Sequence, residues 1–127
     1  MESALVIYPI PPGMRVEDNV LEERLEEAAG LARAINLDVL DCYSVNISKI
    51  SPANFLSKGI IERIADQVEE LEPQVVIFDA ALSPVQQRNL ERHVNCKVID
   101  RTGLILEIFG DRAQTREGKI QVDLALL

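Results

Sequence analysis

Several features that mark common classes of protein are missing from this chain of 127 residues. No apolar run approaches the roughly 18 residues that a membrane-spanning helix needs, so we expect no membrane contact. The first ten residues read MESALVIYPI and carry no basic segment ahead of their short apolar run, which argues against a secretory signal. We therefore expect a cytoplasmic protein.

Cysteine and histidine are scarce, with two cysteines and one histidine in the whole chain. Cys42 and Cys96 fit no CxxC spacing, and His93 alone cannot complete a zinc site with them. No serine or cysteine nucleophile stands at an informative spacing from His93, and no acid and base pair can be placed together from the sequence. The sequence predicts neither a metal site nor a catalytic residue.

The six glycines form none of the known phosphate-binding loops. They match neither GxxxxGK[ST] nor GxGxxG, so the chain has no P-loop and no dinucleotide fingerprint. We expect no enzymatic activity and no bound cofactor from this chain alone. Helix starts remain candidates for anion binding, because their first N–H groups are free.

Basic residues are also few, and the net charge of -8 argues against a general nucleic-acid binder. The charges are uneven, however: residues 1–83 hold 6 basic and 15 acidic side chains, whereas residues 84–119 hold 7 and 5. A positive face is therefore expected from the second half only. Neighbouring acidic residues could instead pair with these cations in an ordinary ion-pair surface, and the sequence leaves both readings open. The candidate phosphate contacts are Arg88, Arg92, Arg112, Arg116 and Lys119.

Four short runs of apolar residues predict strands. Residues 4–10 and 74–78 are almost wholly apolar, which is typical of strands covered on both faces. Residues 38–47 alternate and have one polar side, which favours an edge strand. Residues 97–99 form the fourth run.

Helices are predicted between and after these strands. The first covers about residues 17–35, and the second begins at the Ser51-Pro52 start signal. Ser83, Pro84 and Gln86 make a capping box that starts a helix running to about residue 94. The next helix ends near residues 110–113 and carries its apolar stripe at Leu104, Ile105, Ile108 and Phe109.

Alternating strands and helices predict an α/β fold with a small parallel four-stranded sheet, order 2-1-3-4, and helices on both faces. We assign residues 1–113 to this domain. Residues 114–127 are expected to start a long helix, with Ile120, Leu124 and Leu127 on one face and no stop signal after them. That pattern indicates a piece of a longer protein, and the stripe could support a weak homodimer.

In such a sheet, ligands bind at the carboxyl ends of the strands where the strand order reverses. Here that point lies between the first and third strands. Asp79 and Asp100 each end a strand, so their carboxylates could bind a ribose hydroxyl, a metal or a basic partner, or could simply cap the following turn. The crevice candidates are Asp79, Ser83, Asp100, Arg101, Thr102, Ser57 and Gly59.

The second half of the chain resembles a known family. From Phe78 onward it reads FD-ALSP-Q-RNLE and then C-VIDRTGLIL-IF--RA-T-EGK-QV-LA-L, several short words in one order and at one spacing. These words resemble the amino-terminal domain of HflX-type GTPases, which are ribosome-associated proteins. The resemblance implies a parent protein with a helical hairpin, which residues 114–127 would begin, and a P-loop G domain that binds GTP and Mg²⁺ and is absent from this chain.

The same resemblance implies a function. The domain would be non-catalytic, would dock on rRNA of the large ribosomal subunit through the basic residues named above, and would regulate the G domain during ribosome splitting or rescue under stress. ATP binding is also a family property, but the GxGK word of many relatives reads Ser57, Lys58, Gly59 and Ile60 here. The alternative is a stand-alone α/β sensor of a nucleotide or other small ligand.

Overall fold

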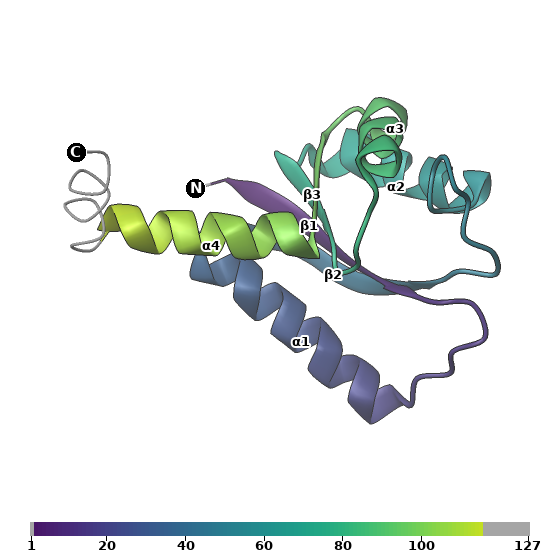
Figure 1. Ribbon diagram of the computed structural model, residues 1–127, viewed down its shortest axis with the longest axis horizontal. Coiled ribbons are helices and arrows are strands. Elements are labelled where there is room, and N and C mark those ends of the chain that lie inside the picture. The colour runs from purple at the N-terminus through teal and green to yellow at the C-terminus, as the bar shows by residue number, and fades with distance from the viewer. Residues whose placement is uncertain (1, 116–127) are drawn as a thin grey trace.

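The computed structural model describes residues 2–115, and these build one parallel sheet with helices on both faces (Figure 1). The strands are β1 (Ser3–Ile10), β2 (Asp38–Asn46), β3 (Val75–Phe78) and β4 (Lys97–Asp100). Their order across the sheet is β2-β1-β3-β4 and every pairing is parallel. The predicted fold class and strand order are therefore confirmed, and β2 lies at one edge of the sheet, as its polar side indicated.

Each face of the sheet is covered by two helices (Figure 1). Helices α1 (Asp18–Ala34) and α4 (Arg101–Thr115) lie together on one face, and α2 (Lys58–Leu71) and α3 (Pro84–Val94) lie on the other. No helix in residues 2–115 is both long and apolar enough to cross a membrane.

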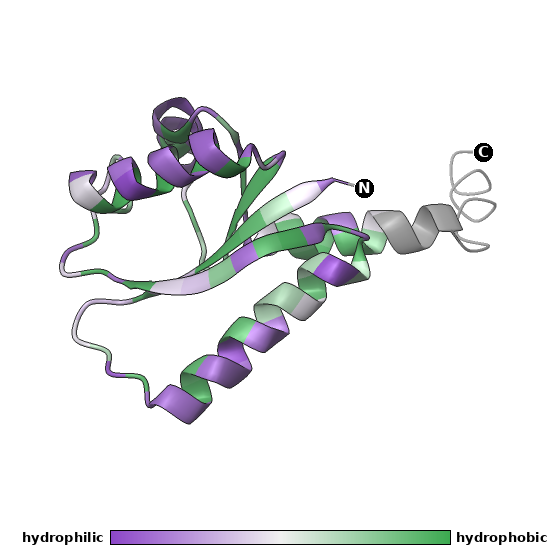
Figure 2. Ribbon diagram, turned by 180° about the vertical axis from the view of Figure 1, so that it is seen from behind, coloured by the Kyte–Doolittle hydropathy of each residue, from purple (hydrophilic) through white to green (hydrophobic). Residues whose placement is uncertain are grey.

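Alternation along β1 divides the core into two halves, as the pleat of a strand requires. Leu5 and Ile7 point into the half beneath α2 and α3, whereas Ala4 and Val6 point into the half beneath α1 and α4. All four side chains are fully buried. In Figure 2 the hydrophobic residues gather on the strands and on the inner sides of the helices, so the two apolar layers hold the helices in place.

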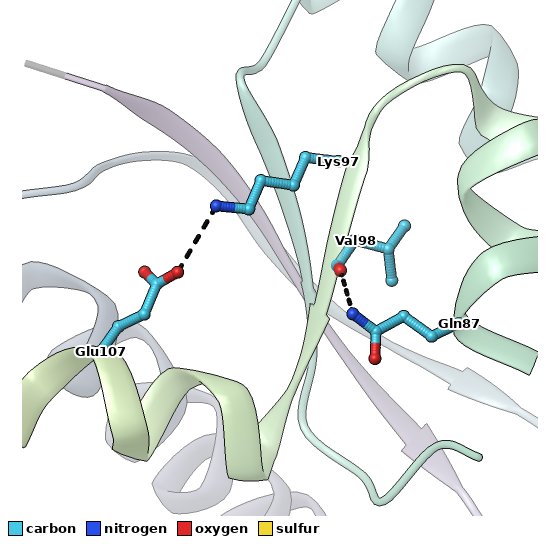
Figure 3. A network of polar contacts seen from close by, with 4 residues as sticks. All are labelled: Gln87, Lys97, Val98 and Glu107. Carbon is cyan, nitrogen blue, oxygen red and sulfur yellow. Dashed lines mark hydrogen bonds and ion pairs between the residues drawn. The ribbon is translucent and has the colours of Figure 1, made fainter. Parts of the chain in front are cut away.

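Helices α3 and α4 are also tied to the edge strand β4 by polar contacts (Figure 3). The Gln87 side-chain amide donates to the Val98 carbonyl oxygen at 2.8 Å, and the Lys97 ammonium lies 3.5 Å from a Glu107 carboxylate oxygen. The Gln87 contact satisfies a carbonyl on an edge strand, where backbone groups otherwise face solvent.

The predicted helix start at Ser51 is wrong, because α2 begins at Lys58. Ser51 instead opens a tight turn: its hydroxyl accepts the Asn54 N–H at 3.1 Å, and its backbone pairs with that of Phe55. Phe55 has a φ of 69°, which ends helical geometry there and lets its ring enter the core. A Ser-Pro pair starts turns as readily as helices, so the start signal was ambiguous.

Helix α4 also differs from its prediction. It runs without a break from Arg101 through Thr115, so the predicted end near residues 110–113 is wrong and Gly110 lies inside the helix. Of the predicted apolar stripe, only Leu104 and Ile108 are buried, whereas Ile105 and Phe109 are exposed. The expected stripe of Ile120, Leu124 and Leu127 lies outside the described residues.

Candidate functional site

The carboxyl ends of β1 and β3 meet at the point where the strand order reverses, which is where ligands bind in such sheets. Asp79 directly follows β3, and its N–H donates to the Ile7 carbonyl oxygen at 2.9 Å, which continues the ladder by one bond. The Asp79 side chain is 11% exposed. One of the predicted crevice residues is thus anchored at the switch point.

Arg101, the first residue of α4, holds two acidic side chains at this end of the sheet. One guanidinium nitrogen lies 3.6 Å from an Asp79 carboxylate oxygen, and the other lies 3.4 Å from a Glu27 carboxylate oxygen on α1. Nearby on α1, the Arg24 guanidinium lies 6.0 Å from the centre of the Tyr8 ring, within reach of a cation–π attraction. The geometry joins α1, β3 and α4.

The electrostatics of Asp79 follow from this setting. Burial raises the pKa of the Asp79 carboxyl above its ordinary value of 3.8, and the nearby Glu27 carboxylate raises it further. The guanidinium groups of Arg101 and Arg24 act in the opposite direction without cancelling the burial effect. Arg101 therefore compensates for part of the cost of a charge removed from water.

Asp100 is buried at the end of β4, and both of its carboxylate oxygens are used within the chain. One accepts the Gly103 N–H at 2.9 Å in the first turn of α4, and the other accepts the Leu82 N–H at 3.1 Å in the loop after β3. The sequence left open whether Asp100 binds a ligand or caps the following turn, and the structure shows that it caps α4.

Ser83 is likewise occupied by a structural role. Its hydroxyl accepts the Gln86 N–H at 3.1 Å, and the Gln86 side-chain oxygen accepts the Ser83 N–H at 2.9 Å, so the predicted capping box is present. The same Gln86 amide donates to the Ser51 carbonyl oxygen, and Asn89 donates to the Ala53 carbonyl oxygen. These bonds fasten α3 to the turn before α2.

The remaining crevice candidates are not part of this cluster. Thr102 is exposed in the first turn of α4. Ser57 and Gly59 lie at the start of α2, on the other face of the sheet, where Ser57 makes no side-chain capping bond and Gly59 has open space beside it. Within residues 2–115, no hydrogen bond or ion pair connects Ser57 or Gly59 with Asp79, Arg101 or Glu27.

Of the basic candidates, the structure describes the side chains of two. Arg88 and Arg92 lie one helical turn apart on α3, both are exposed, and neither forms an ion pair with another described residue. Glu107, one of the neighbours that could have neutralised this region, pairs with Lys97 instead. The side chain of Arg112, and the whole of Arg116 and Lys119, lie outside what the structure describes.

Open grooves occur where α3 faces α2. One has a volume of about 550 Å³ and another about 270 Å³; both include Ala65 and His93 in their linings. Glu69 and Glu72 give the larger groove an acidic character, whereas the smaller one is lined by both Glu62 and Lys58. Among the described residues, no group of three histidine, cysteine or acidic side chains is placed to hold a metal ion.

Sequence reasoning did not identify Glu27, Arg24 or Tyr8 as neighbours of Asp79. Glu27 and Arg24 lie on a helix face that reads as solvated surface, and Tyr8 reads as an ordinary strand residue. The packing of α1 beside α4 brings Glu27 and Arg24 toward Asp79, and the pairing of β1 with β3 brings Tyr8 there. No local signal in the sequence could have shown these contacts.

Comparison with known proteins agrees with this fold. A family described as GTP-binding GTPase N-terminal matches residues 22–110. The chain is 46% identical over 105 residues to the GTPase HflX of Escherichia coli, covering 83% of this chain and 25% of the relative. It is 40% identical over 126 residues to the GTPase HflX of Magnetococcus marinus, covering 99% of this chain and 29% of the relative.

A similar fold occurs in a solved structure, the GTP-binding protein from the hyperthermophilic archaeon Sulfolobus solfataricus in complex with GDP. The TM-score is 0.60 at 21% identity, with 86% of this chain and 30% of that chain covered. This likeness shows the fold alone. The chain thus spans less than a third of the length of the relatives named here.

Proposed function

This chain belongs to the GTP-binding GTPase N-terminal family and is related over most of its length to HflX GTPases, and from this we propose a non-catalytic domain that docks on the large ribosomal subunit and regulates a G domain in the same polypeptide. In this proposal GTP and Mg²⁺ bind to the G domain of the parent protein, which is a GTPase. Residues 114–127 begin the helical connection to that domain.

The observation that carries the docking proposal is the exposed pair of arginines on α3. Arg88 and Arg92 have no acidic partner among residues 2–110, whose side chains the structure describes, although the chain as a whole is strongly acidic. Guanidinium groups bind phosphate oxygens through two parallel hydrogen bonds, so such a pair suits an RNA backbone. Arg112, Arg116 and Lys119 belong to α4 and to the chain after it, and they are proposed as further phosphate contacts, separate from the pair on α3.

The way α3 is held supports the same proposal. Gln87, next to Arg88, bonds to the backbone of β4, and Gln86 and Asn89 bond to the turn before α2. The inner side of the helix is therefore fixed by packing and by hydrogen bonds. Its arginines extend from a rigid support, which reduces the entropy that would be lost on binding.

Regulation of the G domain is proposed to pass through α4. The first residue of this helix, Arg101, forms ion pairs with Asp79 and Glu27, and Glu107, further along the helix, forms an ion pair with Lys97. A movement of α4 caused by the rest of the parent chain would therefore also displace α1 and the end of β3. The proposal requires that the domain changes GTP turnover and has no turnover of its own.

The alternative function, a free-standing nucleotide sensor, has weaker support. The polar groups expected to bind a ligand at the switch point are already hydrogen-bonded or ion-paired within the chain, as shown by Asp100, Ser83 and Asp79. A ligand would have to displace these internal partners, and that displacement would reduce its affinity.

The experiment that tests the proposal uses the natural full-length protein and purified large ribosomal subunits. GTP turnover is measured with and without subunits, for the wild type and for Arg88→Glu combined with Arg92→Glu. We expect the variant to keep its basal turnover and to need several times more subunits for the same response. Equal responses of the two proteins would refute docking through α3.

A further inference from the structure

The two edges of the sheet differ in how their backbones are covered. The edge strand β4 has four residues, its Val98 carbonyl oxygen accepts the Gln87 side-chain amide, and both α3 and α4 contact it. The other edge strand, β2, has nine residues and pairs with β1 only. A long edge strand presents a row of backbone N–H and C=O groups with which another strand can pair.

The register of β2 shows which of its backbone groups face away from β1. The Ile47 N–H donates to the last carbonyl oxygen of β1 at 3.0 Å, and the direction of these groups alternates along a strand. The backbone groups of Cys42, Ser44 and Asn46 therefore point outward. The Cys42 N–H is bonded to the Asp41 carboxylate at 2.8 Å, and within residues 2–110 no other hydrogen bond reaches these outward groups.

The first part of this edge is less suited to pairing. The register between β1 and β2 is irregular between Val39 and Asp41, and Asp38 is an exposed charge. Irregular register and edge charges both hinder the addition of a strand. The regular, open part of the edge is therefore residues 42–46.

A groove of about 600 Å³ lies beside this part of the edge, between β2 and α2. We call it the β2–α2 groove. Its charged lining residues are three acids and one base, namely Asp41, Asp66, Glu70 and Arg63. Asp66 and Glu70 lie one turn apart on α2, both are exposed, and neither forms an ion pair within residues 2–110. The groove therefore carries an excess of negative charge.

Hydrogen bonds across the groove keep β2 and α2 in place. The Gln67 side-chain oxygen on α2 accepts the Tyr43 hydroxyl at 2.5 Å, and the Gln67 amide donates to the Asp41 carboxylate at 2.9 Å. Burial raises the pKa of Tyr43 above its ordinary value of 10.0 and Asp41 raises it further, while Arg63 acts in the opposite direction. The hydroxyl thus stays a donor at neutral pH, and the groove is formed before any partner binds.

We propose that the outer edge of β2 is a docking site for an extended, basic peptide segment of a partner protein, which adds a fifth strand to the sheet. The segment would pair with the outward backbone groups of residues 42–46 and place lysine or arginine side chains in the β2–α2 groove. In this mode of recognition the backbone bonds give affinity, and pockets for alternate side chains give specificity. Asp66 and Glu70 are the carboxylates that are open to these cations.

The charge of the groove argues against other occupants. Two copies paired antiparallel through β2, around a two-fold axis normal to the sheet, would bring their acidic grooves together. Like charges placed opposite each other destabilise such a pair. An RNA backbone would meet the same repulsion, because its phosphates bind to lysine and arginine.

This inference goes beyond ribosome docking and is independent of it. The arginines proposed for docking lie on α3, which packs against β4 and α2, whereas β2 forms the opposite edge of the sheet. The test below uses a peptide and no ribosomal subunit. Failure of one proposal is therefore distinguishable from failure of the other.

The test is a fluorescence anisotropy titration of the natural full-length protein against a short, fluorescein-labelled peptide in which lysine and threonine alternate. This alternation places every lysine on one side of an added strand. A second peptide has the same sequence with methylated backbone nitrogens. Methylation keeps the positive charge and removes the N–H donors that strand pairing requires.

Two pairs of substitutions separate the groove from a general effect of charge. Asp66→Lys with Glu70→Lys reverses the charge in the β2–α2 groove. Glu69→Lys with Glu72→Lys is the matched control, because it makes the same change of charge at exposed positions in the groove between α2 and α3. Any loss of binding that comes from net charge alone would be the same in both variants.

We expect saturable binding of the first peptide to the wild type, and binding at least about tenfold weaker for the methylated peptide and for Asp66→Lys with Glu70→Lys. The control variant should bind within about twofold of the wild type. An absence of saturable binding, equal affinity for the two peptides, or equal losses in the two variants would each overturn the proposal. A dimer of the wild type that Ser44→Pro abolishes would also overturn it, since a second copy would then occupy the edge.

Discussion

The carboxylate of Asp100 accepts the backbone N–H of Leu82 at 3.1 Å across 18 residues of sequence. Its other oxygen accepts the Gly103 N–H at 2.9 Å. One buried side chain thus connects the loop after β3 with the first turn of α4. This connection lies at the carboxyl ends of β3 and β4, next to the switch point between β1 and β3.

The first prediction concerns this connection. Asp100→Ala removes a helix cap, worth about 0.5–2 kcal/mol, and a hydrogen bond to a charged group, worth about 1.5–3 kcal/mol. We expect the free energy of unfolding to fall by about 2–4 kcal/mol in urea titrations. Asp66→Ala, at an exposed position on α2, should change it by less than about 0.5 kcal/mol. A loss for Asp100→Ala as small as that of Asp66→Ala would contradict a connecting role.

The second prediction separates the two partners of the capping box on α3. Ser83→Ala removes one cap bond and should cost about 1 kcal/mol. Gln86→Ala removes the reciprocal bond and also the bond to the Ser51 carbonyl oxygen, each worth about 0.5–1.5 kcal/mol. Thermal unfolding should therefore rank Gln86→Ala as the less stable variant. The reverse ranking would mean that the contact with Ser51 contributes nothing.

The third prediction is a pH dependence at Asp79. Because burial raises the pKa of Asp79 in the folded protein, the folded state binds the proton more tightly than the unfolded state does. This group's stabilising contribution is complete below the unfolded value near 3.8 and is lost as the pH rises through the raised folded pKa. Relative to Asp79→Asn, the wild type should therefore gain stability as the pH falls from 7 through that window.

Urea titrations of the two proteins at several pH values between 7 and 4 measure this difference. Arg101→Gln supplies a second arm, because the Arg101 guanidinium lowers the pKa of Asp79. Without the guanidinium, the pKa of Asp79 should rise further, and the stability change should occur at higher pH. If the wild type instead lost stability relative to Asp79→Asn on acidification, the pKa of Asp79 would not be raised in the folded protein.

The fourth prediction addresses nucleotide binding by the domain itself. A ligand at one hundred times its dissociation constant stabilises a folded protein by about 2.7 kcal/mol, which would shift the melting temperature by several degrees. The internal bonds of Asp100, Ser83 and Asp79 lead us to expect no shift from ATP or GTP with residues 1–127. A shift that follows nucleotide concentration would favour the sensor function instead.

The sequence predicted most of the fold because its signals were local. The apolar runs of β1 and β3 and the capping box at Ser83 need no knowledge of distant residues, and the structure has each of them where expected. The helix start predicted at Ser51 was wrong because a turn and a helix cap can use the same hydrogen bond. In both, the serine hydroxyl accepts the N–H of the residue three positions later, here Asn54. The positive φ of Phe55 distinguishes the turn from a helix start, and this φ depends on how the ring packs in the core.

The candidate site was harder to predict, because its contacts are between distant parts of the chain. Asp79 and Asp100 were both placed at strand ends, yet Asp100 turned inward to cap α4 whereas Asp79 paired with Arg101. That difference depends on how closely α1 and α4 approach the sheet. Helical periodicity likewise could not show that Ile105 and Phe109 face solvent, since they join Leu104 and Ile108 in one broad apolar stripe.

The most direct test of ribosome docking is the affinity of the natural full-length protein for purified large subunits across a salt series. Arg88→Glu with Arg92→Glu is compared with the wild type, and Arg33→Glu, an exposed arginine on α1 at the opposite face of the sheet, is the control. Each lost phosphate contact should reduce the slope of log affinity against log salt by about one. We predict a slope smaller by about two for the double variant and an unchanged slope for Arg33→Glu; identical slopes and affinities for all three proteins would contradict the proposal.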